Sequence, residues 1–338
     1  MNPSLDQFAG CFIGQCLGDA LGFAVEGYPP AVCQQYVHDI LRRSPQVTAA
    51  HRLAEFGQYT DDSQLARELM SSYVTMGRFD PADYASRIAA IFHDKRIVGK
   101  GLATEEAAFR LLDGVHWSEA GARAPSAGNG SAMRAAPIGL IFWDHPEDMI
   151  QAAHDQGRIT HQDPRCSAGA VVIAGAVSLA LQRESRAVSG WTAQLARWAR
   201  SFDPILADGV EQLEALVALE PDEAVRIISR IGIDSDYVDG WKWISPFVTT
   251  SVLWSLYAFL RTPDDYWQTV STAIAVGGDV DTTAAMAGAV SGAYLGLEQL
   301  PRSLTSRLND QRTWSYHELV ELAERCLAQV LQAGSLPG

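Results

Sequence analysis

The chain has 338 residues, and its 40 acidic and 26 basic side chains give a formal net charge of −14. This balance argues against nucleic acid or an anionic membrane surface as a partner, because both require clustered positive charge. The five cysteines are odd in number and show no CxxC spacing, which argues against a disulfide framework or a thiolate zinc site.

The first residues, MNPSLDQFAGCF, lack the basic stretch and apolar core of a signal peptide. The longest apolar run, AGAVVIAGAVSLAL, is shorter than the roughly 20 residues that span a membrane. We therefore expect a cytoplasmic protein without a membrane partner.

Apolar residues recur mostly at three- and four-residue spacings, and alternating strand patterns are hard to find, so the predicted fold class is all-α. In chain order, the predicted helices cover residues 5–24, 62–77, 81–94, 103–113, 147–157, 164–183, 190–201, 207–219, 222–231, 247–261, 264–275, 282–297 and 315–333.

Two of these helices carry a glycine at every fourth position. The glycines are Gly10, Gly14, Gly18 and Gly22 in the first helix, and Gly288, Gly292 and Gly296 in the later one. Each costs a helix about 1 kcal/mol relative to alanine. Because residues four apart share one face, we predict that each helix packs unusually close to a neighbour, and the two are candidates to pack on each other.

Two acidic clusters stand at the starts of predicted helices. The first, in YTDDSQLARELM, holds Thr60, Asp61 and Asp62, and the second, in GGDVDT, holds Asp279, Asp281 and Thr282. Helix capping is the simpler interpretation, but a cap needs one oxygen and not three. Oxygen ligands select hard cations such as Mg²⁺ or Mn²⁺, and so many carboxylates suit two ions. The second interpretation is therefore a metal site.

Two further segments precede helix starts. In SAGNGSAMRAAPIGL, Gly128, Asn129 and Gly130 allow backbone N–H groups to turn inward and bind phosphate, although an ordinary tight turn is the alternative. In ITHQDPRCSAGAVV, His161 stands ahead of the helix that begins at Pro164. A lone histidine is usually structural, but its placement repeats that of the other segments. We therefore predict that four helix N-termini converge on one pocket.

The first glycine-striped helix ends in GDALGFAVEG, with Asp19 inside the helix and Glu26 at its exit. Asp19 is interpreted as a buried hydrogen-bonding residue. Glu26 is a candidate general base.

The segments GDALGFAVE, YTDDSQLA, GNGSAMRAAPIGL, THQDP and GGDVDTTAAMAGAVSGAYLG, in this order, resemble the ADP-ribosylglycohydrolase family over about residues 8 to 298. The resemblance implies a compact, monomeric, orthogonal bundle of helices. It would form a single domain over residues 1–338, with a motif-bearing core at 8–298 and a C-terminal helix at 315–333. It also implies a centre of two Mg²⁺ (or Mn²⁺) ions.

By position, the resemblance implies roles for particular residues. The metal ligands would be Thr60, Asp61, Asp62, Asp279, Asp281 and Thr282, and the catalytic residues Glu26, Asp62 and Asp281. The ligand-binding residues would be Gly128, Asn129, Gly130 and Ser131, which hold the diphosphate, and His161. The motifs do not place an aromatic residue against adenine, and Trp117 is the candidate.

The implied activity is hydrolysis of the bond between ADP-ribose and a protein side chain, with arginine as the first expectation and serine as the second. The partners would be an ADP-ribosylated protein as substrate and ADP-ribose as product. Two alternatives stay open: a non-catalytic ADP-ribose-binding or crystallin-like structural protein, and a different two-metal hydrolase that acts on a phosphoester.

Overall fold

The computed structural model describes residues 2–41, 56–182, 187–233 and 243–333. Within these ranges the chain forms helices and isolated β-bridges but no β-strand, which confirms the all-α prediction. The α-helices are α1 (Leu5–Phe23), α2 (Pro30–Tyr36), α3 (Asp61–Met76), α4 (Pro81–His93), α5 (Leu102–Leu112), α6 (Ala136–Ile141), α7 (Pro146–Arg158), α8 (Pro164–Gln182), α9 (Val188–Ala199), α10 (Pro204–Leu216), α11 (Pro221–Ile228), α12 (Val248–Arg261), α13 (Tyr266–Ala275), α14 (Val280–Leu295), α15 (Arg302–Thr305) and α16 (Tyr316–Ala333).

Three short helices, α2, α6 and α15, were not predicted from the sequence. Each has seven residues or fewer, which is too short for the apolar period to show. The start of α10 was predicted at residue 207, but the helix begins at Pro204, where Asp203 accepts a hydrogen bond from the backbone of Ile205. An aspartate followed by proline is a helix-start signal that the prediction overlooked.

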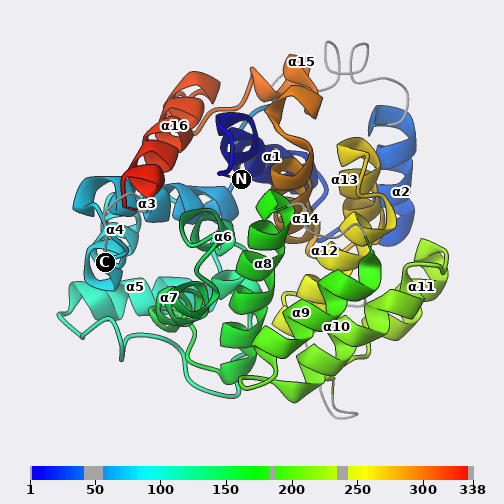
Figure 1. The fold of residues 1–338 in the computed structure, drawn as a ribbon, viewed down its shortest axis with the longest axis horizontal. Coiled ribbons are helices and arrows are strands. Elements are labelled where there is room, and N and C mark those ends of the chain that lie inside the picture. The colour runs from blue at the N-terminus through cyan, green and yellow to red at the C-terminus, as the bar shows by residue number, and fades with distance from the viewer. Residues whose placement is uncertain (1, 42–55, 183–186, 234–242, 334–338) are drawn as a thin grey trace.

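The two glycine-striped helices, α1 and α14, lie side by side near the centre of the molecule (Figure 1). The stripe of α1 faces that of α14, so that a methyl group on Gly10 would overlap Gly292 and one on Gly14 would overlap Gly288. The phenol of Tyr266 donates a hydrogen bond of 2.7 Å to the Gly14 carbonyl oxygen beside this contact. The predicted close packing is confirmed, and the partners are each other.

Helix α8 also lies in the interior (Figure 1). Its 19 residues are long and apolar enough to cross a membrane by length and composition alone, but 83% of that stretch is buried inside the protein. Core helices of globular proteins share these properties, because a helix that is apolar all round is buried on every side.

Candidate active site

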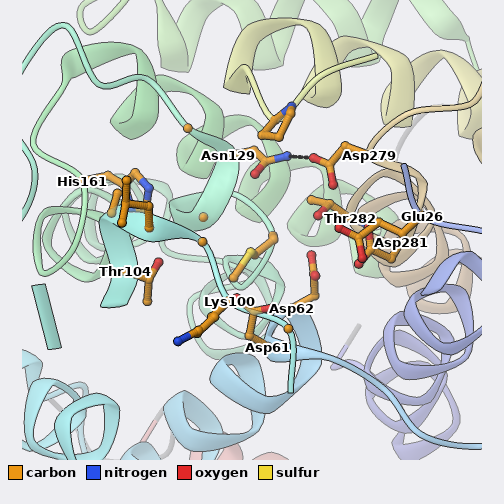
Figure 2. Close-up of a pocket in the computed structure, with 18 residues that line it drawn as sticks. Glu26, Asp61, Asp62, Lys100, Thr104, Asn129, His161, Asp279, Asp281 and Thr282 are labelled. Atoms are coloured by element: carbon orange, nitrogen blue, oxygen red, sulfur yellow. Dashed lines mark hydrogen bonds between the residues drawn. The ribbon is translucent and has the colours of Figure 1, made fainter. Parts of the chain in front are cut away.

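A cavity of about 320 Å³ lies where α3, α14 and α8 begin (Figure 2). Its wall includes five acidic residues, here called the acidic centre: Glu26, Asp61, Asp62, Asp279 and Asp281. The wall also includes Thr282, the glycine loop (Gly128, Asn129 and Gly130) and His161. The predicted convergence of four helix starts on one pocket is therefore confirmed, although the start behind the glycine loop is a short 3₁₀ turn at Asn129–Ser131.

The acidic clusters do not act as helix caps. Thr60 and Asp279 occupy the N-cap positions of α3 and α14, yet neither side chain makes a capping hydrogen bond. Asp279 Oδ2 instead accepts a hydrogen bond of 2.5 Å from the amide of Asn129 (Figure 2). Asp281 lies within the first turn of α14, where its Oδ1 accepts from the backbone N–H of Thr282 over 2.9 Å. The capping interpretation therefore does not account for Asp279, which is the N-cap residue of α14.

The oxygen atoms of the acidic centre fit a metal ion. Glu26, Asp279 and Asp281 can each offer one carboxylate oxygen, and these oxygens lie within 4.8 Å of one another. Asp62 Oδ1 is buried and has no hydrogen-bond partner among the described residues. An orphaned carboxylate oxygen is costly unless a cation or proton binds it, and an all-oxygen donor set suits hard divalent cations.

Burial strongly perturbs this group of carboxyls. It raises the pKa of Asp61 to about 7, and the negative charge of Asp19 adds to the effect. The pKa of Asp62 is raised by burial and then by Asp19 and Asp61. The pKa of Asp281 is raised by burial and then by Asp62 and its other acidic neighbours. Carboxylates held this close repel one another, and a divalent cation between them would remove that repulsion.

Asp19 supports the first acidic cluster from behind. Its carboxylate accepts hydrogen bonds from the backbone N–H and hydroxyl of Thr60 and from the backbone N–H and hydroxyl of Ser63. The interpretation of Asp19 as a buried hydrogen-bonding residue is confirmed. The Thr60 hydroxyl also lies 3.0 Å from Asp62 Oδ2, but Thr60 is not on the cavity wall. Its assignment as a metal ligand stays a prediction.

Glu26 lies in the turn after α1 and is more exposed than the aspartates that it faces. Partial burial raises the pKa of Glu26, and the charges of Asp279 and Asp19 raise it further. Glu26 is therefore an exposed carboxyl at the edge of a strongly acidic cavity. This position suits a group that exchanges protons with water.

The glycine loop differs from the predicted nest of inward-turned N–H groups. Gly128 has an ordinary extended φ of −75°, and Gly130 is not among the residues with positive φ. The N–H of Asn129 is already bonded to the Pro246 carbonyl oxygen at 2.8 Å. The glycines are required for a different reason, since a Cβ on Gly130 would lie 2.6 Å from Cε1 of His161. The loop makes room for the histidine ring.

Two predicted ligand contacts lie elsewhere. The Ser131 hydroxyl points away from the cavity and donates to the Cys166 carbonyl oxygen over 2.8 Å. Trp117 lines a separate surface hollow with Ala89 and Leu111, so the prediction that it stacks on adenine in the site is wrong. The sequence motifs contained no information on this position, because it depends on how α4 and α5 pack together.

Lys100 and Thr104 line the cavity but were not predicted from the sequence (Figure 2). Lys100 pairs with Glu105, and Thr104 is buried near the glycine loop. The segment GKGLATEE, a lysine between glycines ahead of a helix start, could have indicated a ligand-binding loop.

The described part of the chain thus forms an all-helical protein with a cavity lined by five acidic residues. The sequence model of the ADP-ribosylglycohydrolase family matches residues 1–335, and the chain belongs to this family. The chain is 30% identical to the human ADP-ribosylhydrolase ARH3, over 97% of this chain and 94% of that protein. It is 25% identical to the ADP-ribosylarginine hydrolase Tri1 of Pseudomonas putida, over 98% of this chain and 81% of the relative.

A solved structure described as an ADP-ribosylglycohydrolase-related protein complex has the same fold, with a TM-score of 0.70 at 27% identity. It covers 96% of this chain and 98% of that chain. The family match and these relatives confirm the expected family and the prediction of an enzyme of the ADP-ribosylglycohydrolase class.

Proposed function

We propose that this protein removes ADP-ribose from modified arginine side chains by hydrolysing the glycosidic bond at the anomeric carbon of the ribose, with two Mg²⁺ (or Mn²⁺) ions bound at the acidic centre. One observation carries the proposal. Two acidic clusters about 220 residues apart in the chain meet the glycine loop and His161 in one cavity, within a chain that matches the ADP-ribosylglycohydrolase family over residues 1–335.

The ligands proposed for the ions on the cavity wall are Asp61, Asp62, Asp279, Asp281 and Thr282. Thr60, whose hydroxyl lies 3.0 Å from Asp62 Oδ2, is the sixth proposed ligand. Two observations support this choice. The Asp279 side chain makes no capping hydrogen bond, and Asp62 Oδ1 has no hydrogen-bond partner within the described ranges. When bound, the ions would supply positive charge that orients the ribose hydroxyls and water. Asn129 contributes by holding Asp279 in place through its amide.

Side chains of the protein would stabilise charge, transfer the proton and bind the ligand. Cleavage at the anomeric carbon builds positive charge on the ribose, and the nearby carboxylates would stabilise that charge. Glu26, at the exposed edge of the cavity, would take the proton that the attacking water must lose. The glycine loop and His161 would hold the distal part of ADP-ribose, and in Figure 2 His161 lies across the cavity from Asp281.

The preference for arginine over serine is supported by charge. A guanidinium group is a cation, and the cavity edge carries the exposed carboxylate of Glu26. Lys100, a cation on the cavity wall, is paired with Glu105 and so adds little net positive charge. The printed name of the Pseudomonas putida relative also specifies an arginine linkage.

The test incubates the purified protein with ADP-ribosylated arginine and serine peptides, in Mg²⁺ and in EDTA, and measures free ADP-ribose by chromatography. We expect release from the arginine peptide in Mg²⁺ only. Asp281→Asn should abolish release and weaken Mg²⁺ binding, because it removes a charged ligand while keeping the shape of the side chain. Unchanged release by this variant would contradict the assignment of Asp281.

The same experiment separates the alternatives. A non-catalytic ADP-ribose-binding or crystallin-like protein would bind ADP-ribose in a calorimeter but release none from either peptide. A hydrolase that acts on a phosphoester would instead release inorganic phosphate.

A further inference from the structure

Behind the cavity wall, a chain of hydrogen bonds links a buried arginine to the ring of His161. Arg134 Nη2 lies 2.7 Å from Thr160 Oγ1, and Thr160 Oγ1 lies 2.8 Å from His161 Nδ1. All three side chains are buried: Arg134 and Thr160 are 0% exposed, and His161 is 3% exposed. Solvent therefore does not compete for these hydrogen bonds.

The directions of these bonds follow from the groups involved. A guanidinium group only donates hydrogen bonds, so Thr160 Oγ1 accepts from Arg134. The threonine hydroxyl keeps one proton of its own, and His161 Nδ1 is the acceptor beside it within the described part of the chain. The hydroxyl oxygen could also accept from an Nδ1–H group, but its own proton would then have no acceptor within the described ranges. The arrangement therefore favours Nδ1 as the acceptor and places the proton of the neutral ring on Nε2.

The protonated nitrogen lies beside the glycine loop, on the wall of the cavity. A Cβ on Gly130 would lie 3.2 Å from His161 Nε2, and one on Gly128 would lie 3.3 Å from it. His161 Nε2 has no acceptor among the described residues, and the ring is part of the cavity wall. The Nε2–H group is therefore free to bind an oxygen atom of a ligand.

Arg134 is held firmly in its place. Its Nε donates to Gln156 Oε1 and its Nη2 to the Gln156 carbonyl oxygen, both at 3.0 Å. Gln156 in turn donates to the Ser131 carbonyl oxygen over 2.8 Å, next to the glycine loop. Arg134 forms no ion pair within the described ranges; its guanidinium lies over the Tyr84 ring, 5.7 Å from the centroid, and its buried Nη1 has no hydrogen-bond partner there. A buried charge with so few partners is costly. That cost points to a role beyond packing.

We propose that Arg134 and Thr160 are positioning residues that hold His161 as its Nε2–H tautomer, so that the cavity presents a neutral hydrogen-bond donor to the ligand. The proposal rests on the proposed function only for the identity of that ligand, ADP-ribose, because the tautomer belongs to the free protein. One consequence is that His161 acts as a donor and not as a general base, since Nδ1 is engaged and Nε2 carries the proton.

The first measurement is the tautomer itself. Full-length protein labelled with ¹⁵N-histidine is examined by long-range ¹H–¹⁵N correlation at neutral pH, and His161→Gln assigns the signals of His161. We expect the pattern of a neutral ring protonated on Nε2. A ring protonated on Nδ1, or an imidazolium, would overturn the proposal whether or not any variant folds.

The second measurement tests the role of the relay. Thr160→Val keeps the side-chain shape but removes the hydroxyl, so the His161 pattern should change and ADP-ribose binding in a calorimeter should weaken about tenfold. Thr160→Ser keeps the hydroxyl and should retain the wild-type His161 pattern and the wild-type affinity. Thr160→Ala is measured beside Thr160→Val, so that the test does not depend on the folding of one variant. Thr192→Val, which removes a buried hydroxyl in α9, is the matched control and should leave the His161 pattern unchanged.

A wild-type His161 pattern and wild-type affinity in both Thr160→Val and Thr160→Ala would overturn the relay. Failure of the proposed function looks different. In that case the wild-type protein would neither bind nor release ADP-ribose, while the Nε2–H pattern and its dependence on the Thr160 hydroxyl would still be observed.

Discussion

The contact between α1 and α14 reaches the acidic centre, and a glycine pair in α1 can test its role. A methyl group on Gly22 would lie 2.5 Å from the Cα of Asp281 and 2.5 Å from the Val280 carbonyl oxygen. At the other end of the same stripe, a methyl group on Gly10 would lie 2.7 Å from backbone atoms of Gly296 and Leu297. The two sites are about 18 Å apart along the helix, at about 1.5 Å per residue.

The magnitudes follow from these distances. Non-bonded carbon atoms sit about 3.5 Å apart or more, so Gly22→Ala must move the backbone of Asp281 by about 1 Å. Overpacking against backbone costs about 3 kcal/mol, and alanine regains about 1 kcal/mol of helix propensity, which leaves a net loss of about 2 kcal/mol. With about 2.1 cal/mol/K of unfolding entropy per residue, Tm should fall by about 3 °C in either variant.

Activity should separate the two variants. A displacement of about 1 Å at a reacting centre costs about 100-fold in rate, so Gly22→Ala should lose about that much ADP-ribose release and bind Mg²⁺ more weakly. Gly10→Ala should have the same lower Tm and keep wild-type activity at 25 °C. The assays are scanning calorimetry and chromatography of released ADP-ribose. Equal activity in the two variants would refute the reasoning, because it would show that the helix contact does not position Asp281.

Two further predictions concern the carboxyls themselves. Glu26→Gln should lower kcat by about 10² to 10⁴-fold with little change in ADP-ribose affinity, as expected for loss of a general base, and an unchanged kcat would remove Glu26 from that role. Burial raises the pKa of Asp61 from 3.8 to about 7. Between these values the folded metal-free protein holds a proton that the unfolded chain has lost, so its stability falls as pH rises from about 4 to about 7 and levels off above that. Mg²⁺ would replace such protons, so Mg²⁺ should raise Tm more at pH 8 than at pH 5 in calorimetry, and an equal gain at both pH values would contradict this.

Much of the fold could be predicted because its signals are local. Apolar spacing predicts the long helices, and the glycine stripes predict that α1 and α14 each pack close to a neighbour. The convergence of the acidic clusters was also predictable, because Asp61 and Asp281 carry the same chemistry at two helix starts. The helices, the glycine stripes and the acidic clusters can each be read from residue types at short spacings in the sequence.

The finer arrangement of the site depends on packing between distant segments and could not be predicted. The Asn129 amide binds Asp279, although its motif indicated a phosphate loop. The Ser131 hydroxyl donates to the buried Cys166 carbonyl oxygen, and Ser131 does not line the cavity. The orientation of a side chain is decided by which buried partners lie within hydrogen-bond reach, and a motif contains no information on that.

One helix explains how clusters so distant in sequence meet. On one side of α1, Gly22 lies against the backbone of Asp281. On another, the Asp19 carboxylate binds the backbone of the first cluster, and the Gln15 amide donates to the Asp62 carbonyl oxygen over 3.1 Å. These contacts set the distance between the clusters largely through backbone atoms, and they leave Asp62 Oδ1 without a hydrogen-bond partner within the described ranges. Gly22, at the end of the α1 stripe, therefore takes part in positioning the carboxylates of the acidic centre.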